Sequence, residues 1–81
     1  MQIESVYQED LTEFDATMTT VVLNQVDSQC ILARLFIKAM GRPGIDNDLE
    51  FIGSGDRWTV MWTQPVLSIA ETTAIVQQAI H

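Results

Sequence analysis

The sequence predicts a small α+β domain in the order helix, helix, β-hairpin, helix, with the helices packed on one face of a small antiparallel sheet. Three patterns predict it: apolar residues at steps of three and four near the start, an apolar stretch over 30–40, and two alternating segments around "GSGD". Such steps are typical of amphipathic helices, and alternation is typical of half-buried strands. With 81 residues, we expect a single domain over 1–81.

The first expected helix depends on one apolar stripe: Ile3, Tyr7, Leu11, Phe14, Met18 and Val21/Val22. Acidic and amide side chains fill the positions between them, as on the polar face of a helix. The segment 17–26 also supports another interpretation, because its six β-branched residues favour a strand. The order would then be β-α-β-β-α, with residues 17–26 as a third strand.

The second expected helix covers Cys30 to Met40 and has three candidate N-caps: Asn24, Asp27 and Ser28. Its residues are apolar almost all round, with Arg34 and Lys38 on the one polar edge. We therefore expect it to be the central, mostly buried helix, with Cys30 buried and inert.

A final amphipathic helix is expected to run from Ser68 to the end of the chain. Ser68 and Glu71 have the spacing of a capping box. The apolar face of this helix follows: Ile69, Thr72, Val76, Ala79 and Ile80.

The hairpin pairs "DLEFI" with "RWTVMW", with Ser54–Gly55 at its tip. The expected register has three facing pairs: Ile52 with Arg57, Phe51 with Trp58, and Leu49 with Val60. Large apolar residues of both strands then share one face: Leu49, Phe51, Trp58, Val60 and Trp62. Because an isolated hairpin needs an apolar face packed against something, we expect this face to be core. One edge of Trp62 is left to contact a partner.

Charge is distributed unevenly along the chain. Eleven acidic residues oppose four basic ones, for a net charge of −7, which argues against attraction to nucleic acid or anionic lipid. Arg34, Lys38 and Arg42 are spaced i, i+4, i+8 and would line one edge of a helix. This edge either complements the helix C-terminus and the acidic first segment, or docks an anionic partner. The predicted partner-binding residues are Arg34, Lys38, Arg42 and Trp62.

The residue types needed for catalysis or metal binding are not grouped in the sequence. The only histidine is His81, the last residue, and no phosphate-binding glycine motif is present. "GRPG" at 41–44 has the G-x-x-G form of KH domains, but "IDNDLEF" after it predicts a turn and a strand rather than a helix. The acids of "DNDLE" lack the glycine and glutamate that a calcium loop needs. We expect no enzyme activity, no cofactor and no metal site.

Location and function follow from these exclusions. One cysteine permits no internal disulfide, and we find no signal peptide and no membrane-spanning run, so a cytoplasmic protein is expected. The leading hypothesis is a non-catalytic protein-interaction or regulatory module that binds another protein or itself, most simply as a homodimer. The alternatives are a winged-helix-like DNA-binding regulator, with the hairpin as its wing, and an acidic decoy of nucleic acid.

Overall fold

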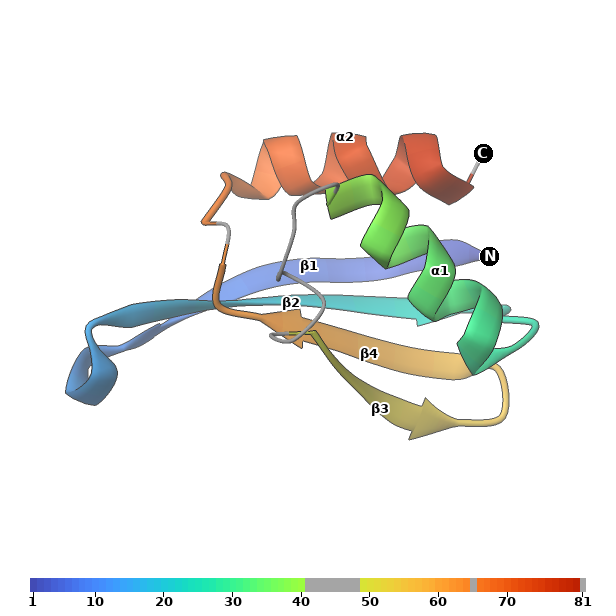
Figure 1. Cartoon of the computed structure of the whole chain (residues 1–81), viewed down its shortest axis with the longest axis horizontal. Coiled ribbons are helices and arrows are strands. Elements are labelled where there is room, and N and C mark those ends of the chain that lie inside the picture. Colours follow the sequence, from blue (N-terminus) through green and yellow to red (C-terminus); the bar gives the residue numbers. More distant parts are fainter. Residues whose placement is uncertain (41–48, 65, 81) are drawn as a thin grey trace.

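The computed structural model of the chain describes residues 1–40, 49–64 and 66–80. Its elements follow the order β-β-α-β-β-α, and two helices lie on one face of a four-stranded antiparallel sheet (Figure 1). The helices are α1 (Gln29–Met40) and α2 (Ile69–Ile80). The sheet has the order β1-β2-β4-β3, with strands β1 (Gln2–Leu11), β2 (Ala16–Asn24), β3 (Glu50–Ser54) and β4 (Arg57–Trp62). A 3-10 turn, Thr12–Phe14, joins β1 to β2.

The expected first helix is wrong, because its residues form β1 and β2, and with it the helix-helix-hairpin-helix order is wrong. The alternative with a strand over 17–26 comes closer, since β2 covers 16–24, but it lacks β1. The expected stripe divides between the two faces of the sheet: Ile3 pairs with Leu23 and packs against the core, whereas Tyr7 pairs with Thr20 and lies on the opposite face. A β-bulge between Ile3 and Ser5 adds one residue to β1 and puts these two side chains on opposite faces although they are four residues apart. Apolar residues on both faces of a strand thus imitate the spacing of a helix.

The core lies between the sheet and the two helices. Its buried members come from both layers: Val21, Leu23, Val26, Leu32, Phe36, Leu49, Val60, Trp62 and Val76. Helix α1 contributes Leu32 and Phe36, one turn apart, whereas its residues Cys30 and Ile31 are exposed. The expectations of a mostly buried helix and a buried cysteine are therefore wrong. With a sheet beneath it, α1 needs only one apolar stripe to pack.

The β3–β4 hairpin forms, but its expected register is wrong by two residues. Ser54, rather than Ile52, lies opposite Arg57. The turn residue Gly55 has a φ of +61°, and glycine at the first of two turn positions is typical of type II′ turns. Because side chains alternate with a period of two, a two-residue shift leaves each one on its expected face. The predicted core face is confirmed: Leu49, Phe51, Trp58, Val60 and Trp62 all belong to the core or pack against it.

The predicted cap of α2 at Ser68 is confirmed, and of the three candidate N-caps before α1 it is Ser28 that caps the helix. The Ser28 Oγ accepts a hydrogen bond from the Ile31 amide at 3.2 Å. The Ser68 Oγ accepts from the Glu71 amide and donates to the Glu71 Oε1, both at 3.0 Å. Each hydroxyl satisfies an amide that has no partner within its helix.

Several features of the sequence lie outside the described residues: the "GRPG" segment at 41–44 with Arg42, the acids Asp46 and Asp48, and His81. Among the residues that are described, neither helix has the length and apolar content required to cross a bilayer.

Candidate functional site

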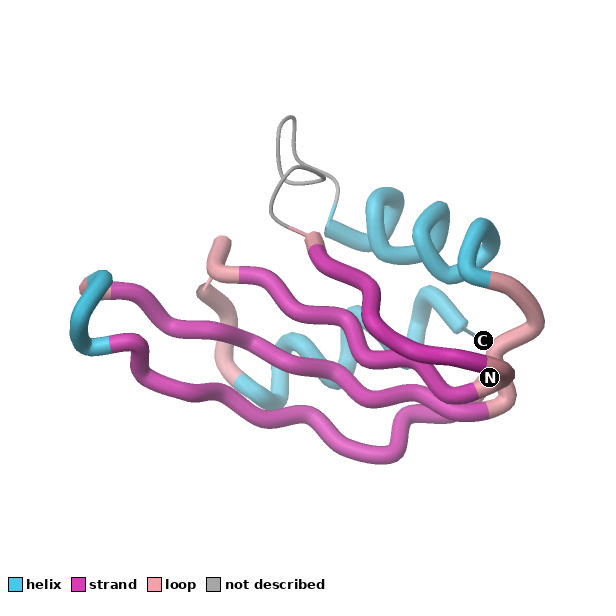
Figure 2. Tube along the Cα trace, turned by 90° about the horizontal axis from the view of Figure 1, so that it is seen from below, coloured by secondary structure: helices cyan, strands magenta, loops and turns pink. Residues whose placement is uncertain are grey.

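The candidate site is the sheet face opposite the helices, which we call the open face (Figure 2). An antiparallel sheet with one solvated face usually carries polar side chains there. On this face the strand register instead gathers apolar side chains near the middle: Tyr7, Met18, Val22, Ile52 and Met61. Val22 is only 8% exposed although it lies on this side. The open face therefore has a small apolar centre of its own.

The outer part of this apolar centre is exposed to solvent. Tyr7, on β1, is 42% exposed, and Ile52, on β3, is 59% exposed. Between them the surface forms a shallow hollow of about 440 Å³, which Val22 and Thr59 also line. An apolar patch with polar surroundings is typical of a surface that binds another macromolecule.

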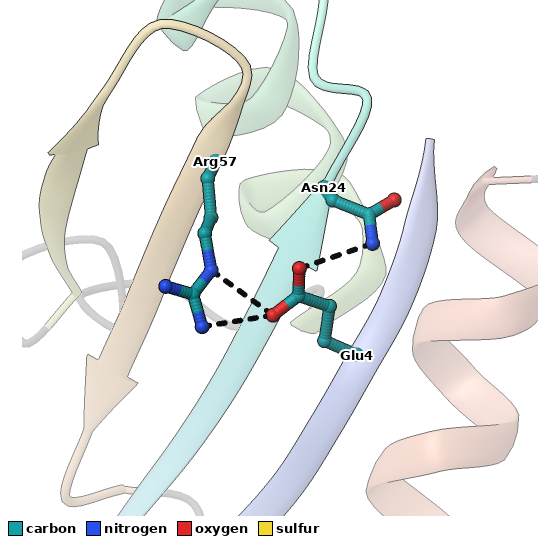
Figure 3. Close-up of polar contacts among 3 residues, drawn as sticks. All are labelled: Glu4, Asn24 and Arg57. Atoms are coloured by element: carbon teal, nitrogen blue, oxygen red, sulfur yellow. Dashed lines mark hydrogen bonds and ion pairs between the residues drawn. The ribbon is translucent and has the colours of Figure 1, made fainter.

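A polar cluster of Glu4, Asn24 and Arg57 borders the hollow (Figure 3). The β-bulge lets Glu4 reach across β2 towards β4. Its Oε1 accepts a hydrogen bond from the Asn24 Nδ2 at 3.1 Å, and its Oε2 accepts one from the Arg57 Nε at 3.0 Å. The Arg57 Nη2 lies 3.0 Å from the same Oε2. These contacts lower the pKa of Glu4, the Asn24 hydrogen bond most and the Arg57 hydrogen bond next.

The charged residues of the open face lie near the two ends of its strands. The Glu4–Arg57 pair lies beside Asn24, at the end of β2, and neutralises the positive charge of Arg57. Glu9 lies opposite Met18 and Glu50 opposite Met61, towards the other end of the strands. The apolar centre therefore lies between a neutralised ion pair at one end and two acids at the other.

The predicted partner-binding residues do not form one surface. Trp62 is 1% exposed, and its ring lies 5.8 Å from that of Phe36, centroid to centroid, so it offers no edge to a partner. Arg34 and Lys38 are exposed on α1, which lies on the covered side of the sheet. Arg42 lies outside the described residues. The prediction that the tryptophan face is core is confirmed most fully by Trp62, since Trp58 is only half-buried.

Sequence reasoning missed the open face, although the hairpin contains a signal for it. Alternation puts Ile52 and Met61 on the face opposite the tryptophans, where polar residues are expected. The contribution of Tyr7 was hidden, because the helical interpretation assigned that residue to a buried stripe. Only the pairing of β2 with both β1 and β4 brings Tyr7 to the same face as Ile52 and Met61.

No three His, Cys, Asp or Glu side chains within residues 1–40, 49–64 and 66–80 are grouped as a metal ion would require. Comparison with protein-family models, with curated proteins and with solved structures finds no match. The function must therefore be argued from the surface itself.

Proposed function

We propose that this chain is a non-catalytic protein-interaction module that self-associates by packing its open face against the open face of a second copy. The observation that carries the proposal is the exposure of Tyr7 and Ile52 at the apolar centre of that face. Sheets pack face to face at about 10 Å, with side chains of the two faces interdigitating. A second copy would remove both side chains from water, at a gain of roughly 25 cal/mol per Å² of apolar surface.

Charge favours this face over others for contact between copies. With a net charge of −7, two copies repel each other in general. On the open face, however, Arg57 neutralises Glu4, and the remaining acids, Glu9 and Glu50, lie towards the other end of the strands. A two-fold axis across the strands would place the neutral Glu4–Arg57 end of each copy over the acidic end of the other, so that the acids of the two copies do not face each other. This arrangement orients the contact more than it strengthens it.

The winged-helix alternative loses its basis in this structure. It required a helix before α1, whereas the described residues there form β1 and β2. The excess of acidic residues also opposes binding to phosphates. We do not propose DNA binding.

The test is the weight-average mass over a concentration series, measured by sedimentation equilibrium. The wild-type mass should rise above the 9.1 kDa of one chain, and Ile52→Glu should lower it at every concentration. Ile69→Glu is the matched control, because Ile69 is also an exposed isoleucine but starts α2 on the other side of the sheet. A wild-type mass equal to one chain throughout, or equal effects of the two variants, would overturn the proposal.

A further inference from the structure

Two further surfaces of the molecule complement each other in shape and charge. The first is the hairpin arm, residues 9–18, which comprises the end of β1, the Thr12–Phe14 turn and the start of β2. β4 pairs with β2 only from Thr19 to Leu23, so the arm extends past the rest of the sheet (Figure 1). The arm shares a hollow with Thr63, Gln64 and Val66, and its tip is accessible to a neighbouring molecule.

The arm combines an exposed aromatic ring with acidic side chains. Phe14, at its tip, is 74% exposed, the highest value among the exposed large apolar residues. Asp10, Glu13 and Asp15 lie close to it in the sequence and are all exposed. Asp15 has a φ of +50°, a conformation that aspartate tolerates better than most residues, and it closes the turn that presents Phe14. The arm thus offers an apolar knob surrounded by negative charge.

The second surface is a groove between α1 and α2. It is a shallow hollow of about 370 Å³ lined by Leu35, Ile75, Ala79, Gln78 and Lys38. Lys38 lies at the groove, and Arg34 lies one turn earlier on α1; both are exposed. Among the described residues, Arg57 and Glu4 form the one ion pair, and neither Arg34 nor Lys38 takes part in it. The groove is apolar with a positively charged rim, the complement of the arm.

We propose that the hairpin arm of one copy docks in the groove between α1 and α2 of a neighbouring copy. Phe14 would pack against Leu35 and Ile75, and the carboxylates of the arm would pair with Arg34 and Lys38. The arm extends from one end of the molecule, whereas α1 starts at the opposite end and runs back only to the middle (Figure 1), so the two surfaces meet only between copies. Burial of Phe14 supplies most of the contact area, and the charge pairs select the partner surface.

This interface goes beyond the sheet-to-sheet contact and does not depend on it. If two open faces pack together, the helices of both copies face outwards and the arms extend past the paired sheets. Both surfaces then remain accessible. The arm and groove would link such pairs into assemblies larger than a dimer.

The test is complementation between two charge-reversed chains. One chain carries Asp10→Lys and Glu13→Lys, with Asp15 kept for its turn conformation; the other carries Arg34→Glu and Lys38→Glu. Both also carry Ile52→Glu, which removes the sheet-to-sheet contact, and circular dichroism checks that each folds. Each chain alone should sediment with the mass of one chain, and the equimolar mixture should rise to at least twice the 9.1 kDa of one chain, because each chain has both an arm and a groove.

Phe14→Ser in both chains separates docking of the ring from charge attraction alone. It should weaken association of the mixture at least tenfold, because both arms then lose the ring that packs in the groove while every charge pair is kept. A mixture that stays at the mass of one chain would overturn the arm-to-groove contact. The open-face proposal would still stand or fall by the effect of Ile52→Glu on the otherwise wild-type chain.

Discussion

Trp58 packs against Gly53 on the facing strand of the β3–β4 hairpin. A Cβ added to Gly53 would lie 2.8 Å from the Trp58 Cα and 2.9 Å from its Cδ2, closer than such atoms approach. The Trp58 Nε1 also donates a hydrogen bond to the Gly55 carbonyl at 3.1 Å. The tryptophan thus covers the end of its own hairpin, and this arrangement requires glycine at position 53.

Gly53→Ala should therefore destabilise the protein by about 1–3 kcal/mol, the usual cost of forcing extra atoms into a packed site. Gly55→Asn is the control in the same hairpin: a Cβ there would meet nothing within 4 Å, and asparagine tolerates positive φ. Urea unfolding measures both variants. Equal midpoints for Gly53→Ala and wild type would show that the Arg57 carbonyl and Trp58 do not approach Gly53 as closely as the structure places them.

Gln8→Leu should also destabilise the protein, by about 1–3 kcal/mol, because it leaves a polar atom without its donor. The Gln8 Nε2 donates to the Leu67 carbonyl at 2.5 Å and to the Thr19 Oγ1 at 3.2 Å. The side chain thereby attaches the segment before α2 to the sheet. Gln2→Leu, at an exposed position of the same strand, should change the unfolding free energy by less than about 0.5 kcal/mol. Similar losses for both variants would contradict this role of Gln8.

Thr72→Val should leave stability unchanged or raise it by up to about 1 kcal/mol, because a buried hydroxyl without a partner is replaced by a methyl group of similar shape. Thr72 is fully buried, and its Oγ1 has no hydrogen-bond partner in the described part of the chain. The control is Thr73→Val, which removes a bond of 2.8 Å to the Ile69 carbonyl. A loss of more than about 1 kcal/mol for Thr72→Val would mean that this hydroxyl is hydrogen-bonded after all.

Glu4 should make stability depend on pH in the acidic range. Its pKa in the folded chain is lowered below the ordinary value of 4.5, so the unfolded chain binds more protons in that range and stability rises with pH. The contribution is fully present above about pH 4.5 and is lost as the pH falls through the folded pKa. The difference in melting temperature between wild type and Glu4→Gln should therefore shrink on acidification.

Nuclear magnetic resonance titration of the Glu4 carboxyl identifies the source of this effect. The Asn24 hydrogen bond lowers the pKa most, and Arg57 lowers it through both a hydrogen bond and its charge, so Asn24→Ala and Arg57→Met should each raise it. An unchanged pKa in either variant would contradict the contact that the variant removes.

Local sequence by itself determined the helix starts, the position of the hairpin and its core face. Ser28 and Ser68 cap their helices by hydrogen bonds to amides only three residues ahead. Both partners of each bond are therefore close together in the sequence. The tryptophan face survives even a two-residue error in register, because a period of two is unchanged by such a shift.

Only the tertiary structure decided the secondary structure of the first 24 residues and which side chains form the open face. The apolar residues of the first segment lie on both faces of β1, with a bulge at Glu4, and only pairing along β2 distinguishes this pattern from that of a helix. Tyr7, Val22 and Ile52 are far apart in the sequence and become neighbours because β2 and β4 lie between the edge strands. The side chains of this surface come from separate strands, and hydrogen bonds between the strands decide which of them are neighbours. The sequence of one strand therefore contains no periodic pattern that reveals the surface.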